Sequence, residues 1–122
     1  MSRLMSVALT EQAVVERRKT VTRRLGWWED KNGRRILKPG DHLTLCRKVM
    51  GRRSGEPLIR LAEVEIVGIR RERLNAIDDY DVVREGFPGR DAAWFADFFT
   101  HEMRCPADVE LTRIEWRYLE TS

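Results

Sequence analysis

A basic segment near the start of the chain contains residue types that could do chemistry. Residues 18–24 read Arg-Lys-Thr-Val-Thr-Arg-Arg. A lysine whose pKa is lowered can act as a general base, and a threonine hydroxyl becomes a nucleophile once a base takes its proton. Lysine and arginine are almost never fully buried unless they are paired. The segment is therefore typical either of a polar strand that lines a pocket for an anionic ligand, or of a solvated basic edge strand that resists aggregation.

Lys19, Thr22 and Glu85 are the candidate catalytic residues. Burial or nearby cations lower the pKa of a lysine, and arginines flank Lys19 at positions 17, 18, 23 and 24. Lys19 and Thr22 would point to opposite faces of a straight strand. They converge only if Lys19 belongs to the junction before the strand. Glu85 is predicted in the last turn of a short helix, where a carboxylate opposes the helix dipole; a solvated helix end is the alternative.

Other familiar sites are not predicted. The chain has no glycine-rich phosphate loop and no dinucleotide-binding fingerprint. Its two histidines, His42 and His101, and its two cysteines, Cys46 and Cys105, lack the spacing of metal ligands. Nothing marks a nucleophile elbow. We therefore expect no metal and no cofactor.

Positive and negative charges are unevenly distributed along the chain. Residues 1–77 contain 18 lysines and arginines against 9 acidic residues, a net charge of +9, whereas residues 78–122 contain 5 against 11, a net of −6. Such asymmetry favours contact with nucleic acid. The basic residues occur as doublets in several segments, which would form one basic face if the segments are adjacent in the fold. The alternative is that the two halves pair with each other.

The length of 122 residues predicts one domain, spanning residues 1–122. The apolar runs are short, far below the roughly 20 residues of a membrane helix. Two cysteines without a signal peptide indicate a reducing compartment. We expect a cytoplasmic protein that does not bind membranes, and the sequence does not indicate its oligomeric state.

Apolar alternation and turn residues predict several short strands. We expect them over residues 4–9, 20–25, 42–50, 58–69 and 109–119. The alternation slips near residues 62–63, which indicates a bulge. Residues 26–40 are predicted as a loop or small hairpin, because Asn32-Gly33 is a strong tight-turn signal.

Three helices are predicted between the strands. The first runs from Thr10 to about Arg18, the second from Asp78 to Gly86, and the third from Asp91 to about Met103. Asp78 is expected as an N-cap and Gly86 as a C-terminal stop. Short strands interleaved with a few helices predict a small α+β domain around a curved sheet or barrel.

Aromatic residues have two interpretations in this sequence. Trp27 and Trp28 follow the basic strand, where either indole could stack on a base or fill the core. On the third helix, apolar side chains recur at helical spacing, which is more typical of a core stripe than of a binding surface. The members of this stripe are Phe95, Phe98, Phe99 and Met103.

Five short motifs, taken in order, resemble the ASCH domain, a β-barrel family related in fold to the PUA RNA-binding domain. They are Arg-Lys-Thr-Val-Thr-Arg at 18–23, Lys-Pro-Gly-Asp at 38–41, Val-Glu-Ile at 64–66, Arg-Glu-Gly at 84–86 and Ile-Glu-Trp at 114–116. The resemblance covers nearly the whole chain. It implies a small PUA-like β-barrel with two to three flanking helices and a cleft that holds RNA or a modified nucleoside.

The resemblance also implies roles for individual residues. In the bacterial acetylcytidine amidohydrolase branch of the family, a Lys-x-x-Thr pair and a glutamate carry amide hydrolysis, and these positions correspond to Lys19, Thr22 and Glu85. Other members resemble ribonucleases or plain RNA binders. The Trp27-Trp28 loop and the aromatic helix depart from the compact amidohydrolases, which leaves the substrate open. The expected nucleic-acid-binding residues are Arg18, Thr20, Arg23, Arg24, Trp27, Trp28, Arg47 and Lys48.

Three functions follow as hypotheses from these residues. The first is a non-catalytic module that binds RNA or a nucleoside. The second is an amidohydrolase for an acylated pyrimidine nucleoside, in which Lys19 activates Thr22 and Glu85 orients the lysine or donates a proton. The third is a ribonuclease that acts on single-stranded RNA in the same cleft, and it requires a groove that is open at both ends.

Overall fold

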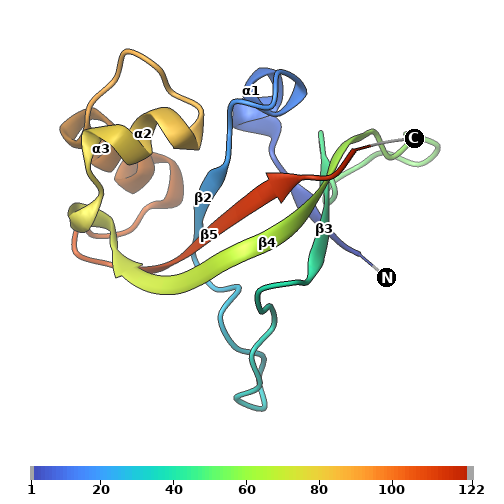
Figure 1. Ribbon diagram of the computed structural model, residues 1–122, viewed down its shortest axis with the longest axis horizontal. Coiled ribbons are helices and arrows are strands. Elements are labelled where there is room, and N and C mark those ends of the chain that lie inside the picture. Colours follow the sequence, from blue (N-terminus) through green and yellow to red (C-terminus); the bar gives the residue numbers. More distant parts are fainter. Residues whose placement is uncertain (1, 121–122) are drawn as a thin grey trace.

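A single curled sheet forms the centre of the computed structural model, which describes residues 2–120 (Figure 1). The sheet has five strands in the order β1-β3-β4-β5-β2, and β1 and β3 run parallel while the other neighbours are antiparallel. The strands are β1 (Arg3–Ser6), β2 (Val21–Arg24), β3 (His42–Cys46), β4 (Arg60–Arg73) and β5 (Glu110–Tyr118). The curled sheet with its helices confirms the predicted α+β barrel-like fold.

Three α-helices flank the sheet. They are α1 (Glu11–Val15), α2 (Asp79–Glu85) and α3 (Ala92–Met103). The helices α2 and α3 lie together at one end of the long β4–β5 pair, and α1 lies across from them, beyond β2 (Figure 1). Single 3-10 turns precede α1 at Ala8–Thr10 and follow β4 at Leu74–Ala76.

The predicted ends of α2 and α3 are confirmed by their capping geometry. The Asp78 carboxylate accepts a hydrogen bond from the backbone N–H of Asp81, and Asp91 accepts one from the N–H of Trp94. Gly86 ends α2 with a φ of 110°, a left-handed conformation that glycine adopts without strain. These caps are local, which is why the sequence pattern was sufficient to locate them.

The prediction of a first helix from Thr10 to Arg18 is wrong in its length. The helix α1 ends at Val15, Arg17 takes a left-handed φ of 60°, and the Thr10 side chain makes no capping hydrogen bond. The backbone N–H groups of Arg18 and Lys19 both turn back to the carbonyl of Ala13. The chain therefore leaves the helix early, and residues 16–20 form a separate junction between α1 and β2.

The central strands also differ from their predicted bounds. The strand β3 ends at Cys46 rather than near residue 50, and β4 continues to Arg73 rather than ending near residue 69. The register of the β3–β4 pair shifts between Leu45 and Cys46, opposite residues 60–62 and next to the predicted bulge. A second shift interrupts the register of the β4–β5 pair between Ile66 and Gly68, and it was not predicted.

Two apolar clusters stabilise this arrangement. One fills the concave interior of the sheet and includes Met5, Leu43 and Trp116. The other packs α2 and α3 against the ends of β4 and β5 through Leu74, Phe95 and related residues. Within residues 2–120, no helix is long and apolar enough to cross a membrane.

The Lys-Pro-Gly-Asp motif at 38–41 forms the turn that enters β3. The backbone N–H of Lys38 donates to the Asp41 carboxylate, and the Lys38 ammonium lies 3.2 Å from it. Gly40 has a φ of 96° and donates to the carbonyl of Ile66. This motif therefore fixes the register of β3 against β4.

Candidate functional site

A pocket of about 230 Å³ lies between β2, the 3-10 turn before α1, and the aromatic face of α3. The side chains of Lys19, Thr22 and Glu85 all line it. The structure thus brings together the three candidate catalytic residues, which are separated by up to 66 positions in the sequence. Its other lining residues are Ser6, Val7, Ala8, Leu9, Thr10, Arg23, Arg24, Phe87, Phe95, Phe98, Phe99 and Met103.

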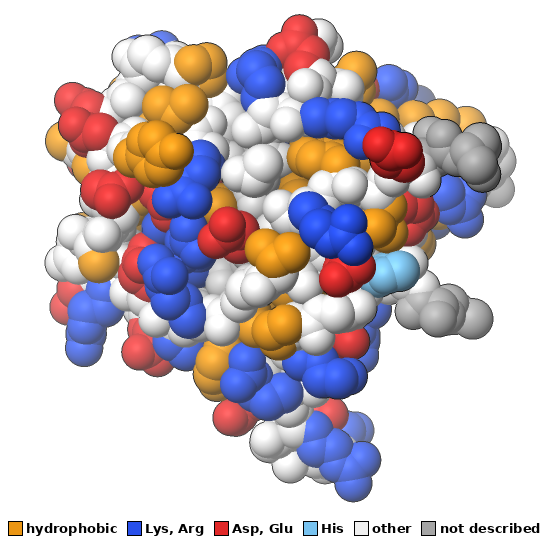
Figure 2. All heavy atoms as spheres, viewed as in Figure 1, with side chains coloured by type: hydrophobic (Ala, Val, Ile, Leu, Met, Phe, Trp, Pro, Cys, Tyr) orange, Lys and Arg blue, Asp and Glu red, His pale blue; other side chains and the backbone are white. Residues whose placement is uncertain are grey.

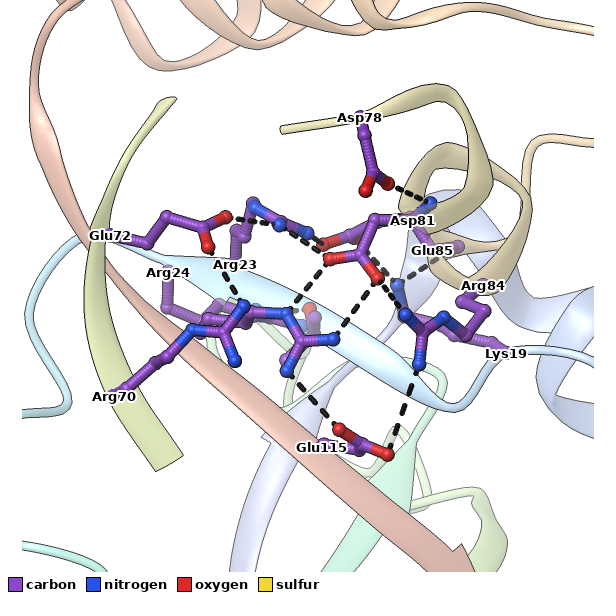
Figure 3. Close-up of polar contacts among 12 residues, drawn as sticks. Lys19, Arg23, Arg24, Arg70, Glu72, Asp78, Asp81, Arg84, Glu85 and Glu115 are labelled. Atoms are coloured by element: carbon purple, nitrogen blue, oxygen red, sulfur yellow. Dashed lines mark hydrogen bonds and ion pairs between the residues drawn. The ribbon is translucent and has the colours of Figure 1, made fainter. Parts of the chain in front are cut away.

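Lys19 is buried in this pocket against the end of α2. Its Nζ donates to the main-chain carbonyl of Glu85 at 2.6 Å and to the Glu85 carboxylate at 3.1 Å (Figure 3). Burial lowers the pKa of Lys19, and the nearby guanidinium groups of Arg24 and Arg23 lower it further, whereas the Glu85 carboxylate raises it. The net direction is downward, which favours the neutral amine that a general base requires.

The backbone at Lys19 is held from three directions. Its N–H donates to Ala13, and its carbonyl accepts hydrogen bonds from the indole of Trp116 at 3.0 Å and from the hydroxyl of Tyr118 at 2.5 Å. Because β2 begins only at Val21, Lys19 lies in the junction before the strand. This confirms the condition under which Lys19 and Thr22 can face one pocket.

Glu85 is the last residue of α2 and is 3% exposed. Its carboxylate oxygens are shared between two cations, Lys19 at 3.1 Å and Arg23 at 3.0 Å. These cations offset the unfavourable position of a carboxylate at a helix C-terminus. The alternative of a solvated helix end is therefore wrong for Glu85.

Asp81 is the centre of a buried ionic network that includes Arg23 from the pocket lining (Figure 3). Its carboxylate accepts hydrogen bonds from Arg23 and Arg113, and it pairs with Arg84 at 2.7 Å. The hydrogen bonds and charges of Arg113 and Arg23 outweigh desolvation and hold the pKa of Asp81 well below its usual range. Arg23 also pairs with Glu72, so the network connects the end of β4 to Glu85.

Sequence reasoning missed this network. Asp81 and Arg113 were not among the predicted site residues. Arg23 and Arg113 lie opposite each other in the β2–β5 register, and Asp81 neutralises both.

Thr22 and Arg24 share the face of β2 that lines the pocket. Thr22 is 3% exposed, and its hydroxyl accepts a hydrogen bond from Arg24 Nε at 3.2 Å. Arg24 Nη2 donates to the carbonyl of Ser6 at 2.7 Å, which links the two edge strands of the sheet. Among residues 2–120, no hydrogen bond joins Lys19 to the Thr22 hydroxyl.

Aromatic side chains form the opposite wall. Phe95 and Phe99 are buried, as expected for a core stripe, but both also line the pocket together with Phe98 and Met103. The ring of Phe98 stacks on Trp94 with centroids 5.0 Å apart and an interplanar angle of 7°. The interpretation of this stripe as core alone is therefore incomplete, because one side of it faces the pocket.

Four of the expected nucleic-acid-binding residues lie on or near β2. Arg23 is 4% exposed and is bound to three carboxylates, so its guanidinium faces the interior. Arg24 lines the pocket, and Thr20 is half-buried in the junction. Arg18 is exposed and pairs with Glu16.

The remaining expected residues lie away from the pocket lining. Arg47 is exposed and pairs with Glu11, and Lys48 pairs with Glu56. Trp27 packs against the sheet core. Trp28 lies in the loop after β2 with the Arg35 guanidinium 3.3 Å from its ring centroid.

Basic side chains do not form one uninterrupted surface on the face shown in Figure 2. They gather on the loop that projects below the sheet and in a group beneath α2, with acidic side chains between them (Figure 2). In the part of the chain that the structure describes, no group of three or more His, Cys, Asp or Glu side chains could hold a metal ion.

Comparison with solved structures identifies the fold class. The ASCH domain from Lactobacillus crispatus JV V101 is 15% identical, covers 95% of this chain and 79% of its own, and gives a TM-score of 0.62. A protein from Enterococcus faecalis V583 is also 15% identical, over 98% of this chain and 80% of its own, with a TM-score of 0.69. The ASCH protein from Zymomonas mobilis is 16% identical, over 93% of this chain and 65% of its own, with a TM-score of 0.57.

These likenesses establish that the chain has the ASCH fold, as its motifs predicted. No family model matches the chain, and no curated protein matches it.

Proposed function

We propose that this protein binds a single acylated pyrimidine nucleoside and hydrolyses its amide bond. The observation that supports this proposal is one pocket of about 230 Å³ that combines Lys19, Thr22 and Glu85 with an aromatic wall. Pockets for drug-sized ligands usually measure about 300–1,000 Å³. The pocket is thus at the small end for such ligands, so we infer that it holds one base with its acyl group rather than several nucleotides.

The two sides of the pocket suit the two ends of such a substrate. Phe87 and Phe98 offer aromatic surface on one side, and base–aromatic stacking contributes about 1–3 kcal/mol per base. Thr22 and Lys19 lie on the other side, where the acylated exocyclic amine would be placed. The aromatic wall thus orients the base and the polar side carries the reaction.

In the proposed reaction, Thr22 Oγ attacks the carbonyl carbon of the amide and transfers its proton to neutral Lys19. The tetrahedral intermediate collapses as the C–N bond breaks, and the Lys19 ammonium returns a proton to the leaving amine. Water then attacks the acyl–Thr22 ester, again with Lys19 as the base, and releases the carboxylic acid and the free hydroxyl. Splitting one difficult step into two in this way is typical of nucleophilic catalysis.

Lys19 requires a change of hydrogen-bond partner to act as this base. Its Nζ now donates to Glu85, and it must come within about 2.6–3.2 Å of the Thr22 hydroxyl, a contact that often tightens only when substrate binds. Glu85 orients the Lys19 side chain until the substrate binds. Its negative charge raises the pKa of Lys19 and so affects the pH at which the lysine becomes neutral.

RNA binding without catalysis is the second candidate function. Exposed Arg34 and Arg35 lie in the loop beside Trp28, and this arrangement favours contact with phosphates and bases. A ribonuclease would need a groove open at both ends. Both alternatives predict that single-stranded RNA binds more tightly than a nucleoside.

The test is release of the acyl group from N4-acetylcytidine by the wild-type protein and by three variants. Lys19→Arg removes the base, since a guanidinium does not deprotonate, and Thr22→Val removes the nucleophile, so both are expected to abolish turnover. Glu85→Gln is expected to reduce it by about 10²–10⁴-fold. Lys31→Arg, on the exposed loop, is the matched control and is expected to retain full activity.

Two outcomes would contradict the proposal. Absence of acyl release by the wild-type protein would shift the assignment to RNA binding. Full activity of Lys19→Arg would place the chemistry elsewhere in the molecule.

A further inference from the structure

We infer that Thr10 selects the base of the substrate by donating a hydrogen bond from its hydroxyl to the ring nitrogen N3 of the acylated cytosine. This inference rests on the proposed function and deepens it by naming the group that recognises the base. Thr10 lines the same pocket as Lys19, Thr22 and Glu85. It was not among the predicted site residues.

The Thr10 hydroxyl has no hydrogen-bond partner among residues 2–120. Thr10 precedes α1, where a threonine oxygen usually accepts a hydrogen bond from the first turn of the helix, but its side chain makes no such bond. In the described part of the chain, the enclosed side-chain nitrogen and oxygen atoms without a partner belong to Arg23 and Arg84. The Thr10 hydroxyl is therefore not enclosed. Because the residue is only 9% exposed and lines the pocket, the space that its hydroxyl reaches is the pocket.

The side chain of Thr10 is held from the opposite side by the end of α2. A methyl group added at Gly86 would lie 3.3 Å from the Thr10 methyl and 3.4 Å from its Cβ. Gly86 directly follows Glu85, whose carbonyl accepts a hydrogen bond from Lys19 Nζ. This packing places Thr10 at the polar end of the pocket, next to Lys19 and Glu85, and leaves its hydroxyl available to a ligand.

The three sides of the pocket offer different contacts to a substrate. The aromatic side chains of α3 contact the face of a base, and because every base has such a face, stacking alone does not discriminate between bases. The catalytic side chains of β2 and its junction would act on the amide. The third side is the segment of residues 6–10, in which residues 7–9 are apolar and the Ser6 hydroxyl already donates to the carbonyl of Arg47. On this side, Thr10 is therefore the residue with a hydroxyl available for the edge of the base.

Nitrogen N3 of cytosine is the atom that this hydroxyl would contact. N3 is bonded to the carbon that bears the acylated amine, so it lies beside the reacting amide when that amide is placed at Thr22. The ring nitrogen accepts hydrogen bonds, and the threonine hydroxyl can donate one. A base with a C–H group at this position would leave the hydroxyl without a partner and shielded from water, which is unfavourable. The contact therefore discriminates between bases by a single ring atom.

The kinetic test uses two substrates that differ only at this atom, N4-acetylcytidine and N4-acetyl-3-deazacytidine. One such hydrogen bond changes kcat/KM by about 3- to 10-fold, and we expect the wild type to prefer N4-acetylcytidine by this factor. Thr10→Val has nearly the same shape and should lose the preference by slowing on N4-acetylcytidine alone. Thr10→Ser keeps the hydroxyl and should retain the preference. Thr100→Val, at a half-buried threonine of α3 outside the pocket lining, is the control and should match the wild type.

A binding measurement separates this inference from the proposed reaction. Cytidine and 3-deazacytidine are the free amines of the two substrates, so their calorimetric titrations need no turnover. We expect the wild type to bind cytidine more tightly by about 3- to 10-fold, and Thr10→Val to bind the two nucleosides equally. If Thr10→Val instead weakened both ligands by the same factor, the role of Thr10 would be structural and the inference would be overturned.

The remaining outcomes are distinct. Acyl release by the wild type at equal rates from the two substrates, or a preference that persists in a folded Thr10→Val protein, would overturn the inference and leave the proposed reaction in place. Absence of acyl release, with a Thr10-dependent preference for cytidine over 3-deazacytidine, would overturn the proposed reaction and leave Thr10 as the base-binding residue. Absence of both acyl release and cytidine binding would overturn both.

Discussion

A methyl group added at Gly86 would lie 3.0 Å from the Cβ of Ala13. This contact marks the place where the end of α2 meets α1. Ala13 also accepts the backbone N–H of Lys19, and Glu85 precedes Gly86. The close approach of the two helices therefore sets the distance between Lys19 and Glu85.

Gly86→Ala is expected to destabilise the protein by about 2–4 kcal/mol. About 1–2 kcal/mol comes from the left-handed backbone and the rest from the contact with Ala13 and Thr10. Gly89→Ala is the matched control, because its φ is +82° but nothing lies within 4 Å of the added methyl. Urea unfolding measures both, and equal losses in the two variants would contradict a role for the helix contact.

Activity is expected to rise with pH through the lowered pKa of Lys19. The base must be neutral, and its neutral fraction grows as the pH passes that pKa from below. The Glu85 carboxylate raises the pKa of Lys19, so the residual activity of Glu85→Gln should show its midpoint at lower pH than the wild type. Rates measured across pH in both proteins test this, and an unchanged midpoint would count against Lys19 as the base.

Asp81→Asn is expected to be strongly destabilising, by about 3–5 kcal/mol, because it leaves buried arginines without their shared partner. Asp97→Asn, on the exposed side of α3, is the control and should change stability by no more than about 0.5 kcal/mol. Thermal and urea unfolding at neutral pH compare the two variants. A small effect at Asp81 would mean that the network can reorganise around Glu72 and Glu115.

Acid should destabilise the wild type partly through the same carboxylate. The pKa of Asp81 is lower in the folded protein than its ordinary value of about 3.9. Its contribution to stability is therefore complete above that value and is lost as the pH falls through the folded pKa. Unfolding free energies measured from about pH 6 downward should fall less steeply for Asp81→Asn than for the wild type. Parallel curves for the two proteins would contradict this assignment.

Cytidine, the neutral product of the proposed reaction, should bind with little dependence on salt. If the protein instead contacts the phosphates of an RNA strand, its affinity for the strand falls with salt. The slope of log affinity against log salt is then about −0.7 per phosphate contact. Calorimetry at low and high salt distinguishes the two modes. A single-stranded RNA that competes with cytidine and shows a steep slope would favour the RNA-binding alternative.

Local signals in the sequence were sufficient for the helices α2 and α3. Asp78, Gly86 and Asp91 act within one turn of the helix that each of them caps, so their effect does not depend on the rest of the fold. The helix α1 was overestimated for two reasons. It ends in a local turn in which Arg17 takes a left-handed φ and Arg18 and Lys19 bond back to Ala13, and the following junction is held by the distant Trp116. Periodicity contains no information about such contacts.

The grouping of Lys19, Thr22 and Glu85 came from the family resemblance. Strand alternation added the condition that Lys19 must precede the strand that contains Thr22, and the structure meets this condition. The different environments of Arg23 and Arg24 could not be predicted, since the two residues are adjacent and of one type. What separates them is Asp81, whose position depends on how α2 packs against β2. The position of Phe98 in the pocket lining was missed for a similar reason. Helical spacing predicts which residues share a face of the helix, but not what that face packs against.

The position of β2 at the edge of the sheet determines when the pocket can form during synthesis. Among the strands of residues 2–120, β2 pairs with β5 alone, and the Trp116 indole that holds Lys19 lies 97 residues further along the chain. Contacts of such sequence separation form late, after the loop-closure entropy has been overcome. During synthesis, the segment with Lys19 and Thr22 therefore has no strand partner until residues 110–118 have left the ribosome. A nascent chain that stops before residue 110 contains every candidate catalytic residue but no assembled site.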